Sequence, residues 1–565
     1  MNKHALLHVP ESRYCFPLNK SEVVIRLRTS KNDDLKISLI YGMKYKYQHE
    51  QKTVEMPLKY TDSLFNYYEI KLTIDDVRLV YVFLIEEDGK QYYFSEDGVT
   101  EEYNFEQAFY NCFQLPYINS NDVMDTVDWM PSTVFYQIFV DRFATGNSKK
   151  DMSYIDMKWG DKPTIKGHAG GDLKGITNHL SYLKDLGISG IYLTPIFQSK
   201  SNHKYDIIDY KKIDKSFGTT EDLVELVKKA HSLGIKIVLD AVFNHCSSEM
   251  EQFIDVRKHG RDSKYYSWFL IDGDAPEPSK GNYECFASCD YMPKLNTANF
   301  QVQDFLIDIA TYWIDVADID GWRLDVADEV SHDFWRLFRK AVKKKKPNSI
   351  IIGENWHDAY PSLMGEQQDS IMNYAFTKSC LDYFARDRYD AKQMAEKLNG
   401  NLMRNMEQVN NMMLNLLDSH DTLRFLTELN SNKKRLKCAI ALTMMMPGTP
   451  CLFYGTEIGL EGGYDPDCRR CFNWDQTEWD MKLWNEVKQL ISIKKNQDAL
   501  HFPEVKISEE KKLLKVERSH ENEKLTMYIN MTDKPVELQI NGNQILAGSI
   551  SENNLEPEAY VIIKG

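Results

Sequence analysis

The ten residues GWRLDVADEV, 321–330, place a cation two positions before a carboxylate. Side chains two apart on a β-strand point to the same face, so we expect Arg323 and Asp325 to lie side by side in apolar surroundings. A neighbouring guanidinium favours the ionised form of a carboxyl group, which is the form that a nucleophile needs. The same pair could also be a buried ion pair with only a structural role, and other segments must decide between the two.

Three other apolar runs also end in polar side chains. They read DAVFNH (Asp240, Asn244, His245), GENW (Glu354, Trp356) and LLDSHD (Asp418, His420, Asp421). Converging carboxylates suit cleavage of a glycosidic bond, which needs a proton donor for the leaving oxygen and a nucleophile for the anomeric carbon. We expect a raised pKa for Glu354 beside Trp356 and a lowered pKa for Asp325 beside Arg323. No serine nucleophile motif and no glycine-rich phosphate loop occurs.

The segments that carry these residues repeat a strand–helix rhythm. Amphipathic stretches, such as a helix opened by Asp172 and ended at Gly187 and another from Thr220, separate eight apolar runs. The runs are 134–140, 189–194, 236–242, 321–327, 349–353, 371–376, 412–417 and 451–454. Eight such repeats predict an α/β fold, a (β/α)8 TIM barrel with its reactive groups at the carboxyl ends of the strands.

Regions on both sides of the barrel show alternating patterns typical of β-strands. We predict an N-terminal β-sandwich over 1–122, the barrel over 123–498 with an inserted subdomain at about 246–300 after the third strand, and a small C-terminal β domain over 499–565. Many N-terminal tyrosines and phenylalanines could stack on sugars, but we expect most of them in the sandwich core. Asn541–Gly542 is a hairpin turn signal.

Composition limits the class of partner. A net charge of -15 argues against nucleic acid and an anionic membrane surface. No segment is apolar and long enough for a signal peptide or a membrane span. The ten cysteines lack framework spacing, and Cys468 and Cys471 form a lone CxxC, so we expect reduced thiols and a cytoplasmic location.

The motifs DAVFNH, GWRLDVADE, GENW and LLDSHD together resemble, in order, those of the alpha-amylase family of glycoside hydrolases. The resemblance covers the whole barrel. It implies that Asp325 is the nucleophile, Glu354 the general acid/base and Asp421 a stabiliser of the transition state. It also implies that Arg323, His245 and His420 bind the cleaved sugar and that Tyr205, in NHKYDIIDY, stacks on it; His203 and Asp206 are further candidates.

MPKLN, 292–296, is similar to the signature of the neopullulanase, cyclomaltodextrinase and maltogenic amylase subgroup. This resemblance implies substrate contacts from Phe286, Trp356, Asp465 and Arg469 and an acceptor-sugar role for Glu329. Asp328 departs from the asparagine common at its position. The subgroup's N-terminal domain commonly packs over a partner's active site, which implies a homodimer through that domain.

Relatives often carry a calcium loop after the first strand. Here the loop reads RFATGNSKKD, 142–151, and Asn147, Asp151, Gly170 and Asp172 remain as candidate ligands. Calcium requires several oxygen ligands, and the Lys150 ammonium would repel it. We therefore predict no required cofactor and no tightly bound calcium, with Lys150 replacing the ion electrostatically.

These observations predict a retaining hydrolase of α-1,4-glucosidic bonds in cyclodextrins, maltooligosaccharides, and pullulan or starch, with some transglycosylation. Two alternatives stay open: an exo-acting α-glucosidase of the same family, and a non-catalytic maltooligosaccharide-binding protein. The three carboxylates argue against the second.

Overall fold

The computed structural model describes residues 1–540 and 543–565, so the predicted Asn541–Gly542 turn lies outside the described residues. The chain divides into two compact units. Unit 1 comprises residues 1–126, 389–410 and 506–516, and unit 2 comprises 127–388, 411–505 and 517–565.

Unit 2 is built on one parallel sheet of eight strands, in the order β18-β17-β16-β15-β12-β11-β20-β19. The N–H of Asn373, just after β18, donates to the carbonyl of Leu414 in β19 at 2.9 Å and closes the sheet into the predicted barrel. The strands are β11 (Phe135–Ile138), β12 (Gly190–Leu193), β15 (Lys236–Ala241), β16 (Gly321–Leu324), β17 (Ile350–Gly353), β18 (Ser370–Ile371), β19 (Leu414–Leu416) and β20 (Thr449–Phe453).

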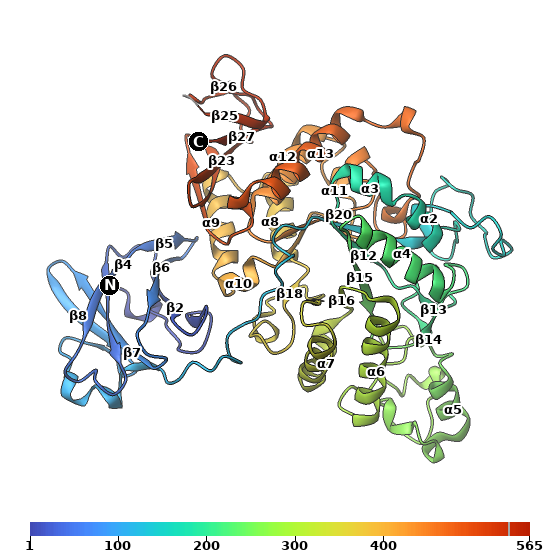
Figure 1. The fold of residues 1–565 in the computed structure, drawn as a ribbon, viewed down its shortest axis with the longest axis horizontal. Coiled ribbons are helices and arrows are strands. Elements are labelled where there is room, and N and C mark those ends of the chain that lie inside the picture. The colour runs from blue at the N-terminus through green and yellow to red at the C-terminus, as the bar shows by residue number, and fades with distance from the viewer. Residues whose placement is uncertain (541–542) are drawn as a thin grey trace. The chain divides into compact units, whose positions relative to one another are not determined.

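Helices surround these strands (Figure 1). Each turns apolar side chains inward; α4, for example, buries Leu223, Leu226 and Val227 and starts at a capping box between Thr219 and Asp222. The helices are α1 (Val140–Phe143), α2 (Leu173–Asn178), α3 (Leu180–Leu186), α4 (Thr220–Ser232), α6 (Phe300–Ala317), α7 (His332–Lys345), α8 (Tyr374–Cys380), α11 (Phe425–Glu428), α12 (Lys433–Met445) and α13 (Met481–Asn496).

Three predicted elements differ from those observed. The helix expected from Asp172 to Gly187 is two helices, α2 and α3, because His179 leaves the helical conformation at ψ 11°. The strand expected over 371–376 ends at Ile371, since Asn373 caps α8 by accepting from the N–H of Phe376. The strand expected over 321–327 ends at Leu324, before Asp325.

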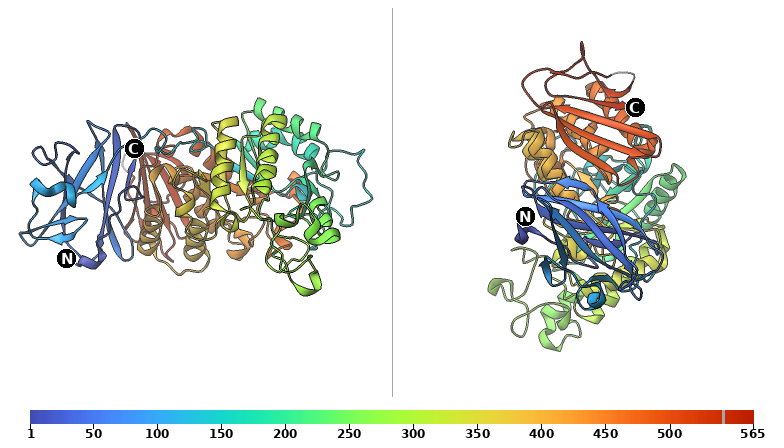
Figure 2. Two further views of the ribbon diagram at one scale, coloured as in Figure 1. Left: turned by 90° about the horizontal axis from the view of Figure 1, so that it is seen from below. Right: turned by 90° about the vertical axis from the view of Figure 1, so that its left-hand side faces the viewer.

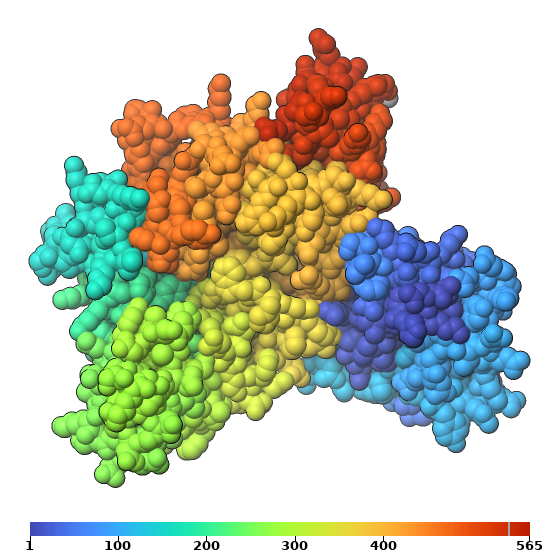
Figure 3. Space-filling model, turned by 180° about the vertical axis from the view of Figure 1, so that it is seen from behind, coloured from blue at the N-terminus to red at the C-terminus, as the bar shows by residue number. Residues whose placement is uncertain are grey.

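The segment between β15 and α6 forms the inserted subdomain. It contains α5 (Glu251–His259) and short antiparallel bridges, including His245 to Lys294 and Phe269 to Leu295. Its small core packs Phe253 edge-to-face against Phe269 and at a tilt against Tyr283, with ring centroids 4.9 and 5.4 Å apart. In the space-filling view this segment is the light green lobe at the lower left (Figure 3).

Unit 1 contains the N-terminal β-sandwich, whose sheets are drawn in blue in Figure 2. One sheet has the order β1-β2-β6-β5; the other has β4-β3-β7-β8-β9, with β10 beside β7. Tyr47, Tyr67 and Tyr68 are buried, as predicted, whereas Tyr45 is 82% exposed. The strands are β1 (Cys15–Pro17), β2 (Glu22–Ser30), β3 (Lys36–Met43), β4 (Lys52–Met56), β5 (Leu58–Thr61), β6 (Phe65–Thr73), β7 (Leu79–Glu87), β8 (Lys90–Ser95), β9 (Gly98–Thr100) and β10 (Phe113–Leu115).

Later parts of the chain complete both units. In unit 1, Asn399 of α9 (Ala391–Leu402) donates to the carbonyls of Thr61 and Ile507. In unit 2, the C-terminal strands β23 (Glu523–Asn530), β27 (Ala559–Lys564) and β25 (Gln544–Gly548) pair antiparallel. Across the described residues, we find no helix with the length and apolar character needed to span a membrane.

Candidate active site

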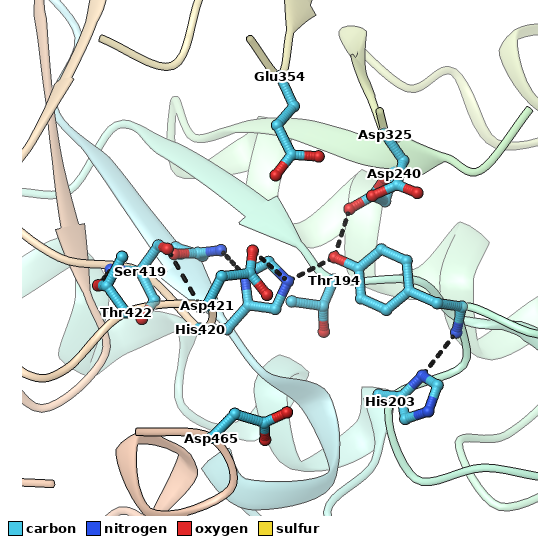
Figure 4. A network of polar contacts seen from close by, with 12 residues as sticks. Thr194, His203, Asp240, Asp325, Glu354, Ser419, His420, Asp421, Thr422 and Asp465 are labelled. Carbon is cyan, nitrogen blue, oxygen red and sulfur yellow. Dashed lines mark hydrogen bonds and ion pairs between the residues drawn. The ribbon is translucent and has the colours of Figure 1, made fainter. Parts of the chain in front are cut away.

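One guanidinium gathers three carboxyl groups at the carboxyl ends of β15, β16 and β17. Arg323 Nη1 donates to Asp325 Oδ1 at 2.7 Å and to Asp240 Oδ2 at 3.1 Å, and Arg323 Nη2 lies 2.8 Å from Glu354 Oε2. Figure 4 shows the carboxyl groups of Glu354, Asp325 and Asp421 turned toward a common space. The predicted Arg323–Asp325 contact is therefore confirmed, and it belongs to a larger cluster.

The backbone beyond β16 explains how Asp325 keeps this position after the strand has ended. The next residue, Val326, has φ 45° and ψ 48°, a left-handed conformation that is rare for a β-branched side chain. This turn aims the Val326 N–H at Glu354 Oε2, 3.0 Å away. Strained backbone of this kind persists where the surrounding structure holds it, as it often does in active sites.

Burial changes the electrostatics that the sequence suggested. The pKa of Asp325 is raised well above its ordinary value because burial and the charges of Glu354 and Asp240 outweigh the opposing effect of Arg323. Burial likewise raises the pKa of Asp240 to about 6. The predicted lowering of the Asp325 pKa is wrong because burial, together with two further carboxylates on the same guanidinium, outweighs the effect of Arg323. The free cluster therefore holds a proton more readily than isolated carboxylates do.

A second group of contacts joins Tyr205 to strand ends β15 and β19. The Tyr205 ring is parallel to the His420 ring, at 2° and 5.5 Å, and its hydroxyl lies 2.5 Å from His420 Nε2. The same hydroxyl donates to Asp240 at 3.1 Å. His420 Nε2 is also 3.3 Å from Asp421 Oδ2. Burial lowers the pKa of His420 far below its ordinary value, so its ring is neutral.

Two residues that hold this network were not predicted. Gln137 pairs with His420 Nδ1 at 2.8 Å, and the Tyr192 hydroxyl donates to Asp240 at 2.5 Å. Each is a polar side chain inside an apolar run at a barrel strand. That interruption is the signal from which both could have been found.

Arg469 fixes the other side of the site. Its Nε donates to the His420 carbonyl at 2.8 Å, and its guanidinium lies 2.9 Å from Asp465 and 3.4 Å from Asp421. Burial raises the pKa of Asp421, while Arg469 opposes this shift. The structure thus brings Asp465, Arg469 and Asp421 together, whereas Asp418 turns away to accept from the Phe425 N–H.

Aromatic rings border the cluster. Phe286, from the inserted subdomain, stacks on His245 at 4.8 Å and 28°. The His245 Nε2 is buried and has no protein partner among the described residues. Trp356 stacks on Tyr374 at 3.7 Å and 7°, is 53% exposed, and donates from Nε1 to Glu354 Oε1 at 3.2 Å. Such rings suit the flat apolar faces of sugars.

The loop where relatives carry calcium does not fit that ion. Lys150 Nζ lies 2.9 Å from Asp172 Oδ2 and donates to the carbonyls of Gly170 and Ser216 at 2.5 and 3.1 Å. The side-chain oxygens of Asn147 and Asp151 accept from the backbone N–H groups of nearby residues instead. A buried ammonium therefore takes the oxygens that a calcium ion would need. The described residues also hold no cluster of three His, Cys, Asp or Glu suited to a metal.

The ten thiols of the described chain are all free. Cys468 and Cys471 are buried, and the Cys468 thiol donates to the His420 carbonyl at 3.3 Å. The CxxC pattern thus contributes packing around the site.

Known proteins resemble this chain over most of its length. Residues 137–520 match the family model for the alpha amylase catalytic domain, and residues 1–119 match the alpha amylase N-terminal ig-like domain. The chain is 43% identical to a cyclomaltodextrinase of Thermoanaerobacter pseudethanolicus over 89% of this chain and 88% of that protein. It is 40% identical to a maltogenic alpha-amylase of Bacillus acidopullulyticus over 95% of this chain and 93% of that protein.

A solved cyclomaltodextrinase structure superposes with a TM-score of 0.92 at 34% identity, covering 100% of this chain and 98% of that one. A neopullulanase 2 of Thermoactinomyces vulgaris is 40% identical over 87% of this chain and 84% of that protein. The chain therefore belongs to the alpha-amylase family of glycoside hydrolases, in the group of the cyclomaltodextrinases, maltogenic amylases and neopullulanases.

Proposed function

We propose that this enzyme opens cyclodextrins and cleaves maltooligosaccharides at α-1,4-glucosidic bonds by a retaining double displacement, with pullulan or starch as further substrates. The observation that carries the proposal is the contact of one guanidinium, Arg323, with both Asp325 and Glu354. Retaining glycosidases need two carboxyl groups about 5–5.5 Å apart, one on each side of the scissile bond, and a shared guanidinium favours such closeness.

In the first step, an Asp325 oxygen attacks the anomeric carbon while Glu354 gives its proton to the leaving oxygen. The bond from the anomeric carbon to the leaving oxygen breaks, and a glycosyl ester forms on Asp325. In the second step, Glu354 accepts a proton from water or a sugar hydroxyl, whose oxygen displaces Asp325.

The other side chains would bind the sugar whose bond is cleaved. Tyr205 supplies a ring face, and Nε2 of His245, which has no partner within the described part of the chain, supplies a buried polar atom for a sugar hydroxyl. His420 and Asp421 would bind hydroxyls on the opposite side, and Arg469 with Asp465 would bind the next sugar. Phe286 and Trp356 would contact sugars farther along the chain.

Product chromatography with β-cyclodextrin, pullulan and maltotriose tests this proposal. Ring opening with maltose and glucose as products supports it. Glucose released from linear ends, with intact cyclodextrin, would instead identify an exo-acting α-glucosidase. Binding without any product would identify a non-catalytic maltooligosaccharide-binding protein.

We further propose a cytoplasmic homodimer, with the N-terminal sandwich of 1–122 as the contact domain, the barrel of 123–498 as the catalytic domain, and 499–565 as a C-terminal domain. Two curated relatives are named intracellular maltogenic amylases. The sandwich exposes large apolar side chains, among them Tyr45, Phe109 and Tyr110, as dimer contacts often do. Sedimentation velocity tests this proposal. The full chain should sediment as a dimer, and the Y45S/Y110S variant should sediment as a monomer.

A further inference from the structure

Lys294 links three segments that meet beside the catalytic cluster. Its Nζ donates to the side-chain oxygen of Asn244 at the end of β15, and to both the carbonyl and the Oε2 of Glu329, at 3.1 and 3.0 Å. Lys294 itself belongs to the inserted subdomain, where its backbone pairs with His245. The Lys294 side chain is only 18% exposed, so the ammonium is partly shielded from water.

Glu329 depends on this contact for its position. It ends the short helical turn Ala327–Glu329, four residues after Asp325, and its side chain is 51% exposed. A half-exposed glutamate has several rotamers open to it, and a fixed ammonium selects one of them. The Lys294 ammonium also donates a hydrogen bond to the backbone carbonyl of Glu329. It therefore fixes the backbone of the turn as well as the carboxylate.

The same ammonium stands next to His245. After burial, Lys294 is the second cause that lowers the pKa of His245, to about 3, which keeps the imidazole neutral. The position of one lysine therefore connects a candidate sugar-binding imidazole to a carboxylate on the next strand end.

We infer that Lys294 is a positioning residue for the acceptor sugar, acting through Glu329 to set how often the glycosyl group passes to a sugar hydroxyl and not to water. This inference rests on the proposed function, because it concerns the second step of the double displacement. There the acceptor oxygen bonds to the anomeric carbon, its proton passes to Glu354, and the ester bond to Asp325 breaks. A fixed Glu329 carboxylate can accept a hydrogen bond from another hydroxyl of the acceptor and orient it for this attack.

The test compares K294M with wild type and K294R. Maltotriose is the donor and methyl α-glucoside the acceptor, and the ratio of transfer product to hydrolysis product is measured by chromatography. We expect K294M to lower this ratio about fivefold, equivalent to about 1 kcal/mol. The hydrolytic kcat should change far less, because no contact joins Lys294 to Asp325 or Glu354 in the described structure. K294R should restore most of the ratio.

Two further variants separate positioning from general damage. K280M removes another lysine of the inserted subdomain, whose ion pair with Glu277 is exposed, and should leave the ratio unchanged. E329Q should lower this ratio as K294M does. The ratio for the double variant K294M/E329Q should be no lower than that for E329Q alone, because both substitutions remove the same Lys294–Glu329 contact. Unchanged partitioning in K294M, or additive losses in the double variant, would overturn the inference.

Failure of the proposed function has a different signature. A wild-type enzyme that releases no product from maltotriose or cyclodextrin would overturn both the proposed function and the role of Lys294. Wild-type transfer that K294M leaves intact would overturn only the role of Lys294.

Discussion

The backbone N–H of Val326 donates to Oε2 of Glu354 at 3.0 Å. Val326 directly follows Asp325, so this hydrogen bond ties the proposed acid to the chain that carries the proposed nucleophile. The bond exists because Val326 adopts a left-handed conformation that its side chain disfavours. Two contacts therefore hold the carboxyl groups of Asp325 and Glu354 near each other: the shared guanidinium of Arg323 and the Val326 amide.

Replacing the proposed nucleophile should stop turnover and leave the fold intact. We expect D325N to lower kcat on β-cyclodextrin by on the order of 10⁴-fold or more, since no other group can form the ester. The variant removes one of three carboxylates crowded on a single guanidinium, so the melting temperature should not fall. Reducing-sugar assays and calorimetry measure both quantities. Substantial residual activity in a preparation free of wild type would refute the assignment.

Glu354 should be dispensable for the first step when the leaving group needs no proton. We expect E354Q to lose on the order of 10³-fold or more in kcat on maltotriose, yet to keep rapid glycosylation by α-glucosyl fluoride. Added azide should then yield α-glucosyl azide by attack on the ester without base help. If E354Q is equally impaired on both donors, Glu354 is not the acid.

Lys150 should make stability independent of calcium. Removing it with K150M leaves the buried Asp172 without its cation, and we expect a loss of about 3 kcal/mol in the free energy of unfolding. The exposed neighbour Lys149 offers the control K149M, which should lose almost nothing. EDTA should not change the melting temperature of the wild type. A melting temperature that drops in EDTA would show that calcium binds despite Lys150.

His8 should make the N-terminal sandwich sensitive to acid. Its ring is buried against Tyr81, Phe83 and Phe113, and burial lowers its pKa from 6.5 to about 4. Between these values the unfolded chain binds a proton that the folded chain does not. The stability contributed by neutral His8 is therefore complete above pH 6.5 and is lost as pH falls toward 4, by about 2 kcal/mol at pH 5.

Urea unfolding of the full chain at pH 7 and pH 5 measures this effect. H8Q keeps a polar side chain at the position but cannot titrate, so its unfolding free energy should fall less over the same interval. An equal pH dependence in wild type and H8Q would exclude His8 as its source.

The sequence was sufficient to predict the barrel, its inserted subdomain and the convergence of Asp325, Glu354 and Asp421. The hydrophobic periodicity and the position of polar residues at strand ends carry that information, because the carboxyl ends of all eight parallel strands lie on one face of the barrel. The sequence was insufficient where a pKa or a side-chain position depends on residues far away in the chain. The pKa of Asp325 depends on burial and on Asp240 and Glu354 sharing Arg323, and Lys294 contacts Asn244 and Glu329 from another segment. Local spacing holds no record of such contacts.

Local competition explains the misplaced elements. The run 371–376 is apolar enough for a strand, but Asn373 starts a helix inside it by capping the Phe376 N–H. His179 interrupts a continuous helical pattern, with its Nδ1 2.7 Å from the Gly175 carbonyl. In both cases one polar side chain outweighed the hydrophobic period.

The most direct test of the account is the anomeric form of the first product from cyclodextrin. ¹H NMR during the first minutes of β-cyclodextrin hydrolysis, before mutarotation, reports which anomer is released. Double displacement through Asp325 and Glu354 predicts opened maltooligosaccharide in the α form, and no product from D325N. Release of the β form would contradict a retaining mechanism, and an intact ring would contradict the proposed substrate.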